Sequence, residues 1–163
     1  MSNKVLVAMV GINPWSAINS VWAAIVTQDF VPDEVHLLAS GKEAVVSAQK
    51  VVSCIDLIMA KMKKNCTIEV LEVDPDDPSS SFEKACDTID KIKKKHSEAE
   101  IALDITSGRK METVGAIMAG YHRKALKHIF YLSINSDANQ HRDCPLFMIP
   151  SSLYSSTDLL RGR

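Results

Sequence analysis

The sequence lacks the features that mark secreted and membrane proteins. Its 4 cysteines match no zinc-ligand spacing and are too few for a disulfide scaffold. No apolar run approaches the length of a membrane span, and no charged leader or small-residue cleavage site precedes the first apolar run. We therefore expect a cytoplasmic protein with reduced thiols and no membrane partner.

The chain also lacks an excess of either charge. Lys and Arg together number 19 against 20 for Asp and Glu, which leaves a formal charge of −1. No long-range field therefore draws the protein to DNA, and we expect no DNA partner. A polyanionic ligand would have to be met by a local cluster of basic groups. With 163 residues, 46% of them hydrophobic, the chain is expected to fold as one domain over residues 1–163.

Common catalytic fingerprints are missing as well. The chain contains neither the G-x-G-x-x-G pattern of dinucleotide sites nor a P-loop, and the G-x-S-x-G elbow of serine hydrolases is absent. The 5 histidines are not spaced for a shared metal, and only His141, in a loop, is placed to reach a ligand. We expect no metal and no cofactor.

Short apolar runs alternate with segments of helical periodicity. The runs that predict strands cover residues 4–10, 34–39, 67–73, 100–105, 128–134 and 146–149. Helical patterns fill the first four gaps, and the fourth helix places a set of apolar residues on one face: Met111, Val114, Ile117, Met118 and Tyr121. The alternation predicts an α/β fold, a three-layer Rossmann-like sandwich around a mostly parallel sheet of about six strands. The loop 135–143 is too short for a parallel crossover, so the last strand is expected to be antiparallel at the edge.

The turn after the fourth strand, from Asp104 to Met111, has the composition of an anion site. Backbone N–H groups at the start of a helix have no intrahelical partner and attract phosphate. Gly108 allows close approach of a phosphate, and Arg109 and Lys110 add charge, with Lys110 favoured to point inward. Thr106 and Ser107 can cap the helix or donate to phosphate, and Asp104 is expected to brace the turn. The alternative is a capped helix with two surface cations.

The turn after the first strand is the second candidate. Asn13 and Ser16 can cap the following helix or touch a ligand, and Trp15 can either stack on a base or pack in the core. Ligands of open parallel sheets bind beyond the carboxyl ends of the strands. If the first and fourth strands are neighbours, both turns face one crevice.

This pair of turns resembles those of the CARF domain of type III CRISPR systems. The second turn reads Asp104-Ile105-Thr106-Ser107-Gly108-Arg109-Lys110-Met111, similar to the family's D-x-T-x-G-x-K-M-like turn, and the order of elements matches from residue 4 to about 149. The resemblance implies a homodimer that binds a cyclic oligoadenylate across its twofold axis, tetra-adenylate being favoured over hexa-adenylate. By motif position the ligand contacts would be Ile12, Asn13, Ser16, Thr106, Ser107, Gly108, Arg109, Lys110 and Met111.

Standalone CARF proteins of this size include ring nucleases, so the resemblance also implies metal-independent cleavage of the messenger. The ribose 2′-OH attacks the adjacent phosphate and leaves a 2′,3′-cyclic phosphate end. Lys110 would stabilise the transition state together with backbone N–H groups at Gly108 and Arg109, while Ser107 or Ser16 would orient the 2′-OH. Neither turn offers an evident general base, so we expect slow cleavage.

Three alternatives remain open from the sequence. The chain could sense the messenger without cutting it, or it could be the sensor domain of a longer effector. It could also be a monomeric enzyme that acts on an ordinary mononucleotide.

Overall fold

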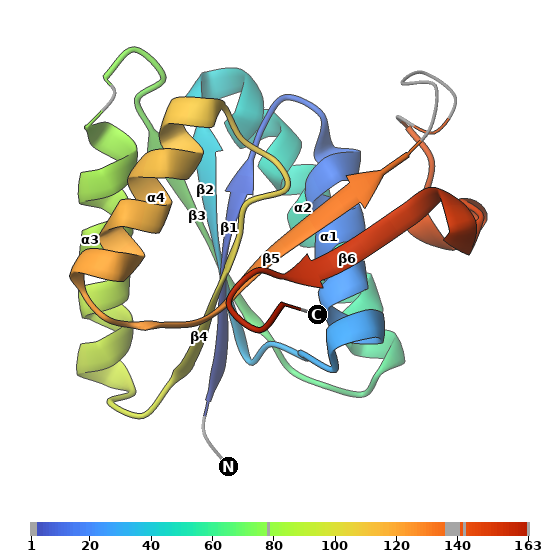
Figure 1. Ribbon diagram of the computed structural model, residues 1–163, viewed down its shortest axis with the longest axis horizontal. Helices are drawn as coiled ribbons and strands as arrows, with labels where there is room; N and C mark the ends of the chain where they lie inside the picture. The colour runs from blue at the N-terminus through green and yellow to red at the C-terminus, as the bar shows by residue number, and fades with distance from the viewer. Residues whose placement is uncertain (1–2, 78, 136–140, 142, 163) are drawn as a thin grey trace.

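A six-stranded sheet lies between two pairs of helices (Figure 1). The computed structural model describes residues 3–77, 79–135, 141 and 143–162. Its elements are β1 (Lys4–Val10), α1 (Pro14–Gln28), β2 (Glu34–Ser40), α2 (Gly41–Lys61), β3 (Thr67–Val73), α3 (Ser80–Lys95), β4 (Glu100–Asp104), α4 (Lys110–His122), β5 (Leu126–Ile134), two short 3₁₀ helices, η1 (Leu146–Met148) and η2 (Ser151–Leu153), and β6 (Tyr154–Asp158). The three-layer α/β fold expected from the sequence is confirmed.

The strand order is β3-β2-β1-β4-β5-β6, with β1 and β4 adjacent at the centre. All neighbouring pairs are parallel except β5 and β6, which are antiparallel, as expected of the last strand. Helices α1 and α2 pack together on one face of the sheet, and α3 and α4 pack together on the other. The carboxyl ends of β1 and β4 therefore lie side by side, each followed by a turn into a helix on opposite faces.

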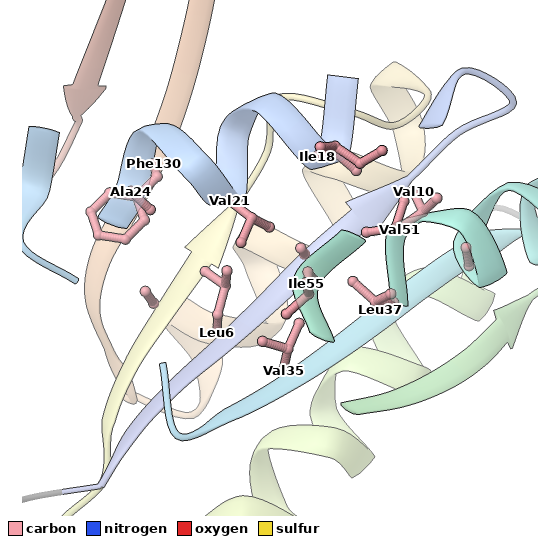
Figure 2. Close-up of a cluster of buried hydrophobic side chains, with 14 of the residues drawn as sticks. Leu6, Val10, Ile18, Val21, Ala24, Val35, Leu37, Val51, Ile55 and Phe130 are labelled. Atoms are coloured by element: carbon pink, nitrogen blue, oxygen red, sulfur yellow. The ribbon is translucent and has the colours of Figure 1, made fainter. Parts of the chain in front are cut away.

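The core forms because the central strands are apolar on both faces. In β1, Leu6, Ala8 and Val10 pack toward α1 and α2, while Val5, Val7 and Met9 pack toward α3 and α4. Figure 2 shows the first of these layers, in which Val21 of α1 and Ile55 of α2 meet Leu6, Val35 and Leu37 of the sheet. Burial on both faces explains why these strands read as unbroken apolar runs.

The predicted position of the last strand, 146–149, is wrong. Residues Leu146–Met148 form η1, and the antiparallel strand is β6, which pairs Tyr154 with Ile134 and Asp158 with Phe130. Pro145 and Pro150 flank the apolar run, and the Leu146 N–H donates to Asn19 Oδ1 at 2.8 Å, so this run cannot join a ladder. Leu146 and Ile149 are instead buried beneath α1.

Helix α4 lies close to α3 because its inner face is made of small residues. A Cβ on Gly115 would stand 2.2 Å from Ser81 Oγ, and one on Gly120 would stand 2.2 Å from a Leu126 methyl carbon. The larger side chains of α4 therefore turn outward, and the exposed ones are Met111, Val114, Met118 and Tyr121. Ile117, predicted on the same face, is half-buried against the core. Within the described ranges no helix is long and apolar enough to cross a bilayer.

Candidate anion-binding site

The turns after β1 and β4 are joined directly. Ala8 and Asp104 are register partners in the sheet, and just beyond them the Gly11 N–H donates to Ser107 Oγ at 3.0 Å. The adjacency on which the shared crevice depends is therefore present. Ser107 is 4% exposed, so its hydroxyl connects the turns from within.

Asp104 braces the second turn, as the sequence predicts. Its Oδ1 accepts the Thr106 N–H at 2.9 Å, and its Oδ2 accepts the Ser20 hydroxyl of α1. Burial raises the pKa of Asp104, and the hydrogen bonds from Ser20 and Thr106 offset part of that rise. The Thr106 hydroxyl oxygen accepts the Leu132 N–H at 2.9 Å, which ties the turn to β5. The turn is thus fixed both to α1 and to β5.

Gly108 occupies a position that no other residue fits without strain. Its φ is +148°, and an added Cβ would lie 2.9 Å from Met9 Cβ and 3.2 Å from Thr113 Oγ1. The backbone here is both in a conformation that favours glycine and pressed against β1. This close approach leaves the outer side of Gly108 exposed, beside exposed Arg109 and Lys110.

Arg109 and Lys110 are the free cations of the site. Neither forms an ion pair with a carboxylate among residues 3–77, 79–135, 141 and 143–162. Because α4 begins at Lys110, its macrodipole adds positive potential at the same place. The arrangement can hold an anion through side-chain charge and helix dipole together.

Glu112 is the site residue that sequence reasoning missed. It is 6% exposed, its Oε2 accepts the Arg109 N–H at 3.1 Å, and its Oε1 accepts the Ser40 hydroxyl at the end of β2. A Glu at the third helical position is the usual signal for such a cap, but here Arg109 stands where the pattern has Ser or Thr. The Arg109 N–H, expected to face phosphate, is therefore engaged by a carboxylate.

The first turn is held by α2 as well as by its own cap. Asn13 Oδ1 accepts the Trp15 N–H at 2.9 Å, so Asn13 caps α1, and its amide lies 3.4 Å from Asp143 Oδ1. The Ile12 carbonyl accepts the Ser47 hydroxyl, while the Ile12 side chain is 61% exposed. Ser16 is half-buried in the first turn of the helix.

Trp15 is placed for packing. It is half-buried against the α1–α2 core and lines an apolar hollow of about 430 Å³ with Trp22, Leu57 and Phe147. Of the two roles that the sequence leaves open, the structure shows the contact with the core. His141, the other outlying candidate, is half-buried, and its carbonyl accepts the Cys144 N–H at 3.3 Å. In the described part of the chain, no group of three or more His, Cys, Asp or Glu residues could hold a metal ion.

No protein-family model and no curated protein matches the sequence. Solved structures do match the fold, among them Csm6 from Enterococcus italicus bound to cyclic hexa-2′-fluoro-hexa-dAMP, at a TM-score of 0.62 and 20% identity over 82% of this chain. Can2 from Sulfobacillus thermosulfidooxidans in complex with cyclic tetra-adenylate matches at 0.53 and 18% over 79%. A type III CRISPR defence DNA nuclease activated by cyclic oligoadenylate matches at 0.56 and 15% over 83%.

This chain spans only 34%, 32% and 19% of the length of those three proteins, in the same order. At such identities the likeness concerns the fold. The chain has the Rossmann-like fold of these three proteins.

Proposed function

We propose that this chain binds a cyclic oligoadenylate of type III CRISPR defence across a homodimer interface and cleaves it slowly without metal. The observation that carries the proposal is the Gly11–Ser107 hydrogen bond, which joins the turn after β1 to the turn after β4, so that a single ligand can contact both turns. The CARF-like sequence of the second turn and the fold shared with Csm6 and Can2, both solved with cyclic adenylates, support the choice of ligand. The cytoplasmic location expected from the sequence belongs to the same proposal.

The outer face of α4 supports the dimer. Met111, Val114, Met118 and Tyr121 form an exposed apolar stripe that starts one residue after Lys110. Contiguous exposed apolar surface is the usual mark of an interaction site. A twofold axis beside this stripe would bring the Lys110 side chains of two protomers to the same cleft.

The charge of the dimer favours a small ring. Each protomer offers Arg109 and Lys110 at the start of α4, and neither has an ion-pair partner among the residues that the structure describes. Two protomers together provide one cation for each phosphate of a cyclic tetra-adenylate, which is why tetra-adenylate is favoured over hexa-adenylate. Doubling the number of cations in the cleft also supplies the local basic cluster that a polyanionic ligand needs when each chain has a net charge of −1.

The proposed cleavage is an internal transesterification. The 2′-oxygen bonds to phosphorus, the bond from phosphorus to the 5′-oxygen breaks, and the 2′-OH proton passes to the departing 5′-oxygen. Lys110 would stabilise the charge of the five-coordinate transition state. Ser16 would orient the 2′-OH, while Ser107, which is buried and accepts the Gly11 N–H, would hold the two turns in place around the ring. Glu112 is engaged by Ser40 and the Arg109 N–H, so a ready general base is missing from this scheme and turnover should be slow.

Single-turnover incubation with labelled cyclic tetra- and hexa-adenylate in EDTA tests the proposal. We expect slow conversion to linear products ending in a 2′,3′-cyclic phosphate. Lys110→Ala should abolish cleavage and weaken binding at least tenfold, whereas Lys94→Ala, an exposed lysine near the end of α3, should change neither. Intact rings after long incubation despite tight binding would refute the nuclease step.

The engaged state of Glu112 favours one second candidate, a sensor without catalysis. Such a protein would bind the ring as tightly and pass the signal to a partner or to a further domain through its dimer interface. Binding without cleavage in the same assay would identify it. A mononucleotide enzyme would instead bind ATP or AMP as a monomer, which light scattering distinguishes.

A further inference from the structure

A polar cavity lies at the opposite end of the sheet from the turns. It has a volume of about 450 Å³ and is lined by the first residues of β2 and β3 and by the last turns of α3: Glu34, His36, Thr67, Ile68, Glu69, Lys91, Ile92 and Lys95. The turns of the anion site follow the carboxyl ends of the strands, whereas this cavity lies at the amino ends. It is therefore separate from the anion site.

The acidic and basic groups of the cavity differ in depth. The side chains of Glu34 and His36 are 10% and 6% exposed, and they form the floor. Lys91 and Lys95 reach down from α3 while remaining 64% and 57% exposed. Their ammonium groups contact Glu69 Oε1 at 2.8 Å and Glu34 Oε1 at 2.5 Å. The exposed lysines thus lie over a floor formed by Glu34 and His36.

His36 is the unsatisfied group of this floor. Its Nδ1 lies 3.2 Å from Glu69 Oε2 and its Nε2 lies 3.7 Å from Glu34 Oε2, yet neither ring nitrogen forms a hydrogen bond within the described ranges. Burial lowers the pKa of His36, and the neighbouring Glu69 and Glu34 carboxylates offset only part of that effect, which favours the neutral ring.

A neutral imidazole between two carboxylates is left with a conflict. One ring nitrogen carries a hydrogen and the other carries a lone pair, whereas ionised carboxylates only accept. In either tautomer, one nitrogen presents its lone pair toward a carboxylate oxygen. A buried polar group without a partner is costly, so a donor with at least two hydrogens is favoured beside the ring, where it can reach both the free nitrogen and a carboxylate oxygen.

We propose that the cavity over His36 binds a small organic cation through its ammonium or guanidinium group. The group would donate one hydrogen to the free nitrogen of His36 and another to Glu69 or Glu34, displacing Lys91 or Lys95 toward solvent. An anion is disfavoured because the deepest charges of the cavity are the carboxylates and both lysines already have partners. Binding of the cation at this cavity does not depend on binding of the cyclic nucleotide.

Calorimetry with agmatine, which carries both cationic groups, tests the site on the whole protein at low salt. We expect one agmatine per chain, with a change in the ¹⁵N resonances of the His36 ring. Glu69→Gln, which keeps the shape of a half-exposed side chain, should weaken binding at least tenfold. Lys91→Ala should tighten it several-fold because it removes the competitor for Glu69.

The opposite result for Lys91→Ala, weaker binding, would mean that the cavity takes anions and would overturn the proposal. Unchanged His36 resonances at millimolar agmatine would mean that water alone bridges the ring, and would overturn it equally. Lys94→Ala is the matched control, since Lys94 is an exposed lysine of α3 that does not line the cavity. Uncharged butanol at the same concentration should give no heat.

Discussion

The two edges of the same sheet use their carboxylates differently. At the carboxyl edge, Asp104 and Glu112 accept hydroxyl and backbone N–H groups that fix the turns, and the cations Arg109 and Lys110 face solvent without ion pairs in the described structure. At the amino edge, carboxylates flank the buried rings of His36 and His128 instead. The net charge of −1 is therefore unevenly distributed. The carboxyl edge can receive an anion, whereas the amino edge contains contacts between carboxylates and histidines.

The second amino-edge cluster explains how the last strand is anchored. His128 Nδ1 and Asp158 Oδ2 are 2.7 Å apart, and His128 Nε2 lies 2.6 Å from Glu100 Oε1. Asp158, which is 1% exposed, also accepts the N–H groups of Ile129 and Leu160. Changes in the His128–Asp158 cluster should therefore act on stability, while changes in the turns at the carboxyl edge should act on binding of the cyclic nucleotide.

The largest effect expected is that of Asp158→Ala on stability. Removing the Asp158 carboxylate leaves His128 Nδ1 and the Ile129 N–H without their partner, and each buried polar group left unpaired costs about 1–3 kcal/mol. Urea denaturation should show this loss, whereas Asp90→Ala, which breaks the exposed pair with Arg123, should cause a far smaller one. Equal losses for the two variants would contradict the structural role of the amino edge.

Gly108→Ala tests the role of the carboxyl edge in ligand binding. The strained φ and the contact with Met9 Cβ should cost roughly 1–3 kcal/mol. Because the turn itself must shift, affinity for cyclic tetra-adenylate should fall at least tenfold. Gly162→Ala is the matched control: its φ is also positive, at +65°, but a Cβ there meets nothing within 4 Å. Calorimetry should find the ring bound normally by the control, and normal binding by Gly108→Ala would exclude this turn as the site.

A smaller effect is expected from pH. Because the folded-state pKa of His36 is lowered, the unfolded chain binds more protons between that pKa and about 6.5. The free energy of unfolding should therefore fall as the pH drops from the pKa of His36 in the unfolded chain toward its lower pKa in the folded protein. His36→Leu should remove this part of the slope, and denaturation at pH 7.5 and 6 measures it. A slope unchanged by the substitution would show that His36 is not the group responsible.

Much of the fold can be predicted from the sequence for two reasons. The buried strands are apolar throughout, and apolar residues recur at helical spacing in the helices that connect them. The failure at the last strand has a physical cause. Leu146 and its apolar neighbours have the sequence pattern of a strand. The flanking prolines and the hydrogen bond to Asn19 instead hold them in the 3₁₀ helix η1. The real strand, Tyr154–Asp158, is polar because it lies at the edge of the sheet.

The candidate site was predictable only where its chemistry is local. Gly108, Lys110 and the bracing by Asp104 can be read from one turn of the sequence. The engagement of Glu112 by Ser40 depends on residues 72 positions apart, and the Asp104–Ser20 bond on residues 84 positions apart. Such contacts exist only once the strand order has brought the segments together.

The stoichiometry of cyclic tetra-adenylate binding tests the central claim most directly. Titration calorimetry in EDTA should give one ring for every two chains, and Lys110→Ala should reduce the affinity at least tenfold. One ring per chain, or unchanged affinity in that variant, would contradict a shared site at the carboxyl edge of the sheet.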